Sequence, residues 1–141
     1  MPKRIKIEIP GVPIAKARPK FARRGRLTVA YDPQEKEKRV WVNMAKILID
    51  EKLEGPLFLK AYFCMPRAKS HYGTGKNSGK LKKSAPQHHV KKPDLDNMIK
   101  WVCDCLNGIA YHDDAQIIQI MSAKWYSDFP CTQIELTQTE E

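Results

Sequence analysis

The sequence lacks any long apolar run and any secretion signal. No segment approaches the roughly 20 apolar residues of a membrane-spanning helix. The first ten residues alternate charge with isoleucine and do not form the apolar core of a signal peptide. We therefore expect a cytoplasmic protein with no membrane partner, and a length of 141 residues fits one domain with one core.

Cysteines are few and poorly spaced for zinc. They stand at positions 64, 103, 105 and 131. One residue separates Cys103 from Cys105, whereas structural zinc sites use pairs separated by two to four residues. We predict four free thiols that serve mostly as small core residues.

Acidic residues are scarce in two segments that are rich in Lys and Arg. Residues 1–30 hold one acid, Glu8, and residues 67–92 hold none. The net charge is +9, and much of it comes from these segments. Such segregation favours a polyanionic partner, because neutralising phosphates and releasing their counterions drives binding. A merely solubilising surface is the alternative interpretation.

The hydrophobic pattern mixes strands and helices without a strict alternation. We predict strands at 5–9, 57–63, 117–125 and 132–136, the last two forming a hairpin across 127–130, and helices from about 33 to 53 and from Pro93 to Gly108. Residues 13–28 are interpreted as a basic loop or short hairpin around Arg24-Gly25, and residues 68–90 as a flexible basic loop. The predicted class is α+β: a single domain, 1–141, with a mixed sheet packed against two main helices.

Carboxylates concentrate where the second helix begins and just after it ends. Five of the eight aspartates lie between positions 94 and 114: Asp94, Asp96, Asp104, Asp113 and Asp114. Like charges repel, so their concentration in a basic protein needs a reason. Mg²⁺ supplies one, because it takes oxygen ligands from a few carboxylates, water and substrate phosphate.

The spacing within the second predicted helix places a lysine beside these aspartates. Asp96, Lys100 and Asp104 are four residues apart and share one helix face. A lysine there can hold a substrate phosphate or stabilise developing charge. Each residue also has a structural interpretation: Asp94 as a helix cap, Asp96 with Lys100 as a surface ion pair, and Asp113 with Asp114 as loop residues.

Two other motifs are weaker indications of function. The glycines and lysines at 73–80 resemble a phosphate-binding loop, but three residues, not four, separate Gly75 from Gly79, and Leu81 follows Lys80 where Ser or Thr is required. We expect a flexible basic loop that touches the DNA backbone. His112 adjoins the acidic pair, and a catalytic role for it stays open.

One long pattern resembles a known family. Lys92-Pro93-Asp94-Leu95-Asp96-Asn97, then Lys100, then Asp113-Asp114-Ala115-Gln116, is similar to the RusA family of Holliday junction resolvases. Ile9-Pro10-Gly11 with Lys16, Arg18 and Pro19 resembles the family's opening strand and basic turn.

The resemblance implies a RusA-like fold and a homodimeric, Mg²⁺-dependent endodeoxyribonuclease, with Mn²⁺ as a substitute. Such an enzyme nicks paired strands of four-way DNA junctions in recombination and repair. The implied metal ligands and catalytic acids are Asp94, Asp96 and Asp114, with Asp113 as an alternative ligand, and the implied catalytic lysine is Lys100. The DNA-binding residues that we expect are Lys16, Arg18, Lys20, Arg23, Arg24, Lys76, Lys80, Lys82, Lys83, Lys91 and Lys92.

Two other functions stay open on the sequence. One is a looser nuclease that cuts branched or flap DNA. The other is a non-catalytic nucleic-acid-binding domain, in which the aspartates only cap helices and pair with cations.

Overall fold

The computed structural model describes residues 2–139, which build a four-stranded sheet and a separate two-stranded hairpin. The order in the sheet is β1-β6-β4-β5. Its strands are β1 (Arg4–Pro10), β4 (Leu57–Pro66), β5 (Ile117–Ser127) and β6 (Cys131–Gln138). The α+β class predicted from the sequence is confirmed.

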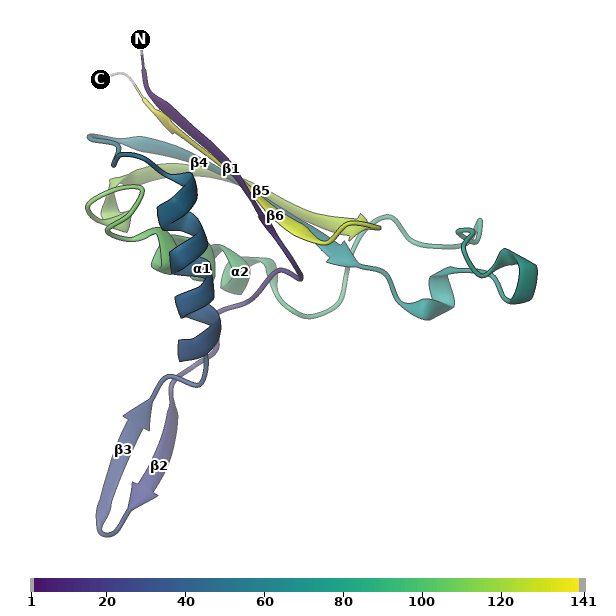
Figure 1. Ribbon diagram of the computed structural model, residues 1–141, viewed down its shortest axis with the longest axis horizontal. Helices are drawn as coiled ribbons and strands as arrows, with labels where there is room; N and C mark the ends of the chain where they lie inside the picture. The colour runs from purple at the N-terminus through teal and green to yellow at the C-terminus, as the bar shows by residue number, and fades with distance from the viewer. Residues whose placement is uncertain (1, 140–141) are drawn as a thin grey trace.

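Both main helices lie on one face of this sheet (Figure 1). These are α1 (Glu35–Leu48) and α2 (Leu95–Leu106). The alternation in β1 sends Ile7 and Ile9 into the core beneath them and leaves Lys6 and Glu8 exposed. Between the helices, the rings of Trp41 and Trp101 meet edge to face with centroids 6.2 Å apart. The helices are thereby fixed to each other and to the sheet.

The helix α1 is shorter than the predicted range of 33–53. Asp32 does not cap it directly, because its carboxylate accepts from the backbone N–H of Gln34 at 2.8 Å, and the helix begins only at Glu35. At the other end Ile49 is extended, and Leu53 bridges to Tyr111 beside α2. The last residues of the predicted helix therefore belong to the connection that packs against the loop after α2, residues 107–116.

The predicted hairpin between the last two strands is wrong. Strand β4 lies between β5 and β6, parallel to β5 and antiparallel to β6. Three residues, 128–130, join β5 to β6, and three extended residues span about 10 Å, which is enough to pass over one strand. Leu59, Ala61 and Phe63 of β4 are buried on the face that the helices cover, and neighbouring strands cover both edges of β4.

Two basic segments extend from this body (Figure 1). The hairpin of β2 (Lys20–Arg24) and β3 (Leu27–Tyr31) turns at Gly25, whose φ of +61° suits glycine. We call it the basic hairpin. The second segment, residues 67–92, contains the short turns η1 (Lys69–His71) and η2 (Gly75–Asn77). We call it the basic loop; its flexibility stays a prediction.

The basic loop is attached to the end of β5 around Tyr126. The backbone N–H of Tyr126 donates to the carbonyl of Gln87 at 3.0 Å. The rings of His71 and His89 pack on Tyr126 with centroids 4.7 and 5.0 Å away. This attachment sets where the chain leaves the loop and enters α2.

The thiols and the helix lengths also bear on the expectations from the sequence. All four cysteines are free, and Cys64, Cys105 and Cys131 are buried, as predicted. Within residues 2–139, no helix has the length and apolar character to cross a membrane.

Candidate active site

Asp94 and Asp96 stand at the start of α2, as the sequence predicted. Asp94 occupies the N-cap position and Asp96 the first turn, and both side chains are exposed. The Asp94 carboxylate accepts no capping hydrogen bond from the described helix, so the cap interpretation is correct in position but not in bonding. Both carboxylates therefore face solvent at the positive end of the helix dipole.

Lys100 lies one turn beyond Asp96 on the same side. Its Nζ is 3.9 Å from Oδ2 of Asp96, an exposed and long ion pair worth little in stability. The predicted alignment of the two residues is confirmed. The lysine is consequently available for another anion in the same place.

Asp104, one turn further, is committed elsewhere. Its Oδ2 lies 2.8 Å from Nζ of Lys38 on α1 and 3.5 Å from Nζ of Lys16. Burial opposes ionisation, but the hydrogen bond from Lys38 and the charges of Lys38 and Lys16 outweigh it, so the pKa of Asp104 is lowered. This aspartate ties α2 to α1 and to the base of the basic hairpin.

The second acidic pair, Asp113-Asp114, follows α2 in a tightly held loop. The hydroxyl of Tyr111 donates to the carbonyl of Cys103 at 2.6 Å and fixes the loop against the helix. Gln116 then joins the loop to the α1–β4 connection. Its Oε1 accepts from the backbone N–H of His112 at 2.8 Å and of Asp113 at 3.1 Å, and its Nε2 donates to the carbonyls of Leu53 and Gly55 at 3.0 Å.

The carboxyl groups of this pair interact with each other. A hydrogen bond between them raises the pKa of Asp114 and lowers the pKa of Asp113. Burial, and then the charge of Asp114, raises the pKa of the Cys103 thiol to about 11. The hydrogen bond from Tyr111 to Cys103 holds the start of the loop that carries this pair against the C-terminal half of α2.

The two acidic pairs are spread along α2 and do not form one cluster. Asp96 and Cys103 are seven residues apart, which is about 10 Å along a helix. Within residues 2–139, no three His, Cys, Asp or Glu side chains lie close enough to hold one metal ion. The donor chemistry still fits Mg²⁺, because this ion is often bound by one or two carboxylates together with water and substrate phosphate.

His112 pairs with a glutamate on a neighbouring segment, and its catalytic role stays a prediction. Its Nε2 lies 2.7 Å from Oε1 of Glu54. This exposed pair links the acidic loop to the segment before β4, the same segment that Gln116 contacts. We interpret His112 as a support for that loop.

Lys124 is a residue that sequence reasoning missed. Its Nζ donates to the carbonyls of Lys91 at 2.6 Å and Pro93 at 2.8 Å, immediately before Asp94. The signal was its phase in β5, since Lys124 is an even number of residues from Ile120 and Tyr126 and shares with them the helix side of the sheet. Lys124 positions the start of α2.

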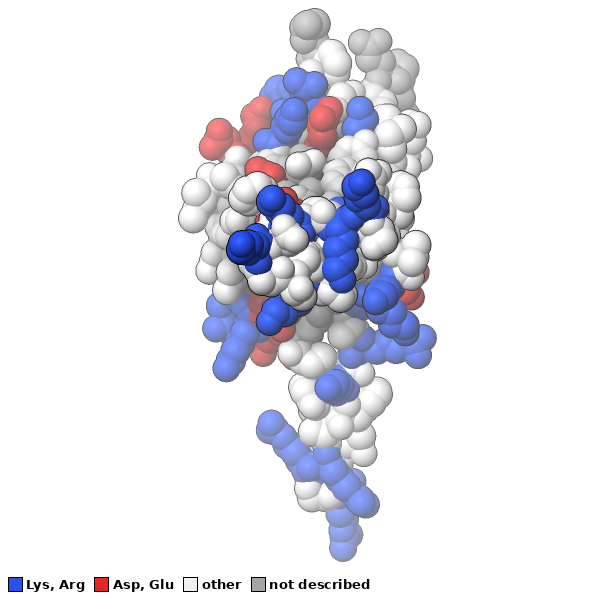
Figure 2. Space-filling view, turned by 90° about the vertical axis from the view of Figure 1, so that its right-hand side faces the viewer, with Lys and Arg blue, Asp and Glu red and all other residues white. Residues whose placement is uncertain are grey.

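Basic side chains cover the surface around these acids. All the expected DNA-binding residues are exposed: Lys16, Arg18, Lys20, Arg23, Arg24, Lys76, Lys80, Lys82, Lys83, Lys91 and Lys92. Figure 2, which faces the basic loop, shows Lys and Arg across this side and along the protruding hairpin, with few acids. Lys16 joins this surface to α2, because its backbone N–H donates to the carbonyl of Asn97 at 2.9 Å.

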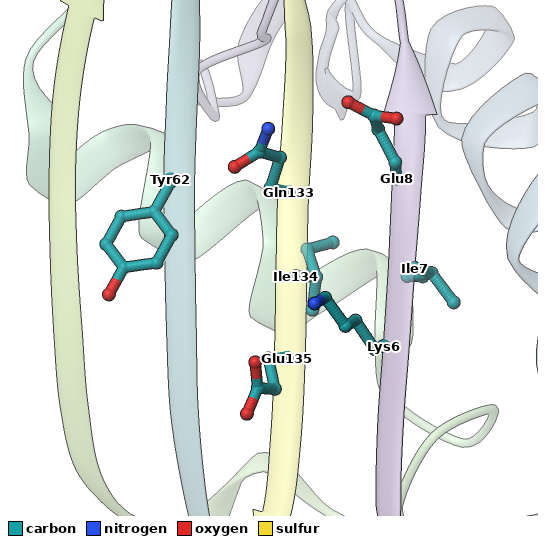
Figure 3. A pocket seen from close by; sticks show the side chains of 7 residues that line it. All are labelled: Lys6, Ile7, Glu8, Tyr62, Gln133, Ile134 and Glu135. Atoms are coloured by element: carbon teal, nitrogen blue, oxygen red, sulfur yellow. The ribbon is translucent and has the colours of Figure 1, made fainter.

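The opposite face of the sheet has a different character. A shallow hollow there is lined by Lys6, Glu8, Tyr62, Gln133 and Glu135, with the helices behind the sheet (Figure 3). Its charges are mixed, and none of the motif's aspartates lines it. The acidic pairs on and after α2 are therefore the better candidate site.

Comparison with known proteins identifies the family of this chain. The model of the family described as endodeoxyribonuclease RusA matches residues 10–137, which include both acidic pairs and Lys100. A protein of Bacillus subtilis (strain 168), "Uncharacterized protein YqaN", is 31% identical over 143 residues, covering 95% of this chain and 96% of that protein. The chain therefore belongs to the RusA family of endodeoxyribonucleases.

Proposed function

We propose that this protein is an Mg²⁺-dependent endonuclease that resolves four-way DNA junctions by paired nicking. One observation carries the proposal. Exposed carboxylates at the start of α2 stand beside Lys100, between two basic segments that contain no acid. Carboxylates that serve only as caps or ion-pair partners would be committed, as Asp104 is.

The acids are the proposed ligands, and Lys100 is the proposed phosphate contact. Asp94 and Asp96 offer oxygens at the start of α2, and Asp114, with Asp113 as the alternative, offers them from the loop that follows the helix. When bound, Mg²⁺ neutralises charge on the phosphate and makes water a better nucleophile at neutral pH. Lys100 lies along the same helix and holds the scissile phosphate by its negative oxygens.

The basic segments are the proposed grip on the DNA backbone. Lysines 80, 82 and 83 extend from the loop, and Lys20, Arg23 and Arg24 from the hairpin. Contacts of this kind fix the position of the duplex without reading its sequence. The preference for a junction then comes from its shape.

The free edge of β5 is the proposed dimer interface. β5 pairs with β4 on one side, and at its other edge only Trp125 bridges to His88 among the described residues. Ile118, Ile120 and Met121 are exposed along this strand. An exposed apolar edge strand favours pairing with another strand, and a two-fold axis there would give matched sites for two strands of one junction.

A cleavage assay on a synthetic four-way junction and a matched duplex tests this function. We expect symmetric nicks near the branch in Mg²⁺ or Mn²⁺, little cutting of the duplex, and none in EDTA. Ca²⁺ is larger and more loosely coordinated, so it should support binding better than cleavage. Tight binding without cleavage in Mg²⁺ would contradict the proposal and favour a binding domain; equal cutting of flaps would favour the looser nuclease.

A further inference from the structure

The basic hairpin exposes large apolar side chains that the rest of the fold leaves uncovered. Phe21 is 71% exposed and Leu27 is 70% exposed. The two strands contact mainly each other and extend away from the body (Figure 1). An isolated two-stranded hairpin is only marginally stable in water, so apolar groups on its surface indicate a partner that covers them.

These side chains lie on both faces of the hairpin. Phe21 pairs with Ala30, and Arg24 pairs with Leu27 three positions along. Because side chains alternate along a strand, Phe21 and Leu27 point to opposite faces. Neither face can then be a core face, and a partner must lie on both sides of the hairpin.

The charge of the hairpin selects the partner. Residues 9–31 contain six Lys or Arg and no acid: Lys16, Arg18, Lys20, Arg23, Arg24 and Arg26. The same hairpin of a second copy would bring like charges together. A nucleic acid instead supplies phosphates for the cations and base faces for the apolar groups.

Disrupted DNA offers those base faces at the lowest cost, because entering an intact duplex requires unstacking its base steps. In an intact duplex, the bases are stacked on one another, and a protein meets phosphates and groove edges. At a branch point stacking is interrupted, and apolar side chains can enter between base steps. An aromatic ring gains further by stacking on an exposed base.

We propose that the β2–β3 hairpin is a wedge that enters the branch point of the DNA, with Phe21 and Leu27 against the base faces on its two sides. Arg23 and Arg24 hold the adjoining phosphates. This inference rests on the proposed function and adds to it the element that distinguishes a junction from a duplex.

The base of the hairpin is anchored beside the acids, as a wedge requires. Gln34 donates to the carbonyl of Ala15 and accepts from the N–H of Ala17, both at 2.8 Å. Lys16 donates its N–H to Asn97 in the first turns of α2 and pairs with Asp104. The wedge therefore keeps a fixed relation to the helix that carries Asp94 and Asp96.

The test compares two double variants on a four-way junction and a matched duplex. The apolar variant Phe21→Ala/Leu27→Ala should weaken junction binding roughly tenfold or more and change duplex binding little, because alanine cannot stack on the bases. The charge variant Arg23→Ala/Arg24→Ala should weaken both and reduce the salt dependence by an amount equivalent to about two phosphates. Phe21→Trp keeps the stacking ring and should keep the preference.

A base analogue reports the wedge directly. With 2-aminopurine at the branch point, wild type should raise the fluorescence as the base unstacks, and the apolar variant should not. The same probe within an arm should respond to neither protein. Circular dichroism and the melting temperature check that the variants fold, which we expect because both side chains are exposed.

Three results would overturn the inference. If wild type prefers the junction and the apolar variant keeps both the preference and the fluorescence rise, the wedge is wrong and the proposed function stands. If wild type shows no preference, both are wrong. If, without DNA, the wild type sediments as a dimer and the apolar variant as a monomer, the hairpin instead binds a second copy of the chain.

Discussion

At the scale of single residues, the aspartates of α2 differ in whether a cation within the fold already pairs with their carboxylate. Asp104 is neutralised by Lys38 and Lys16 within the fold. Asp96 has only a long contact with Lys100, and Asp94 caps nothing. Chemically identical side chains on one helix can therefore be compared directly.

Asp96→Asn should lower junction cleavage by orders of magnitude while binding persists or tightens, because repulsion of the phosphate falls and a metal ligand is removed. Asp114→Asn should behave likewise, and Asp113→Asn more mildly. Asp104→Asn is the matched control: it should lower the melting temperature by breaking two ion pairs, with a far smaller effect on cleavage by folded protein. A near-normal rate for Asp96→Asn would show that the ligand assignment is wrong.

The motif spacing predicted where these acids stand but not what Gln116 does. Asp94, Asp96 and Lys100 are placed by local helix geometry, which a sequence pattern contains. Gln116 acts on Leu53 and Gly55, more than 60 positions away along the chain. Its capping box with Asp113 is local, but only tertiary packing brings Gln116 to these two carbonyls, so no local pattern could have assigned that contact.

Gln116→Glu should destabilise the protein by about 1–3 kcal/mol, because two donors that face carbonyls are replaced by an acceptor. Urea unfolding measures this difference, with Gln119→Glu as a control that makes the same change on an exposed position of β5. Cleavage should fall with Gln116→Glu as the acidic loop loosens. Equal unfolding midpoints for the two variants would contradict the role given to Gln116.

At the scale of elements, the strands and helices were predictable because each has a clear apolar period. The pairing of the strands was not. A short connection between β5 and β6 usually means a hairpin, yet β4 takes the place between them and buries Leu59, Ala61 and Phe63. Which strand is central depends on the competition among all of them for the core.

The basic loop should contact the DNA backbone. Replacing Lys80, Lys82 and Lys83 with alanine should weaken junction and duplex binding together. The slope of log affinity against log salt should also fall, by up to about one unit for each lysine that neutralises a phosphate. Affinity measured over a series of salt concentrations provides the slope. An unchanged slope would show that this loop does not touch phosphates.

The attachment of the basic loop should also depend on pH. Burial, and then nearby Arg or Lys charges, lowers the pKa of His71 and of His89 below the ordinary 6.5. The unfolded chain therefore binds more protons, so the stabilising effect is present above pH 6.5 and is lost as the pH falls toward the folded values. Asp104, whose pKa is lowered, keeps its stabilising effect above its ordinary 3.8 and loses it only at lower pH, so it should not change the stability across the histidine range.

Unfolding by urea between pH 7 and 4.5 measures this dependence. The free energy of unfolding should decline across that range in wild type, and decline less in His71→Phe, which keeps a ring against Tyr126 but cannot take a proton. His88→Phe is the control, because His88 is exposed. Parallel curves for wild type and His71→Phe would refute the assignment.

At the scale of the whole molecule, one chain of 16.2 kDa offers one set of acids between two basic arms. A four-way junction presents two equivalent strands, so one set can cut only one strand at a time. Pairing two chains at the β5 edge would supply matched sites and a wider basic surface. Light scattering at low micromolar concentration should therefore give the mass of a dimer.

The most direct test of the central claim uses a supercoiled plasmid that extrudes a cruciform, which is a four-way junction that disappears once the supercoil is released. Paired nicks within one binding event convert the plasmid to linear DNA, whereas a single nick relaxes it and leaves an open circle. We predict linear product in Mg²⁺ with wild type, and neither product with Asp96→Asn. Open circles alone, from a wild-type protein that binds the cruciform, would contradict paired resolution by a dimer.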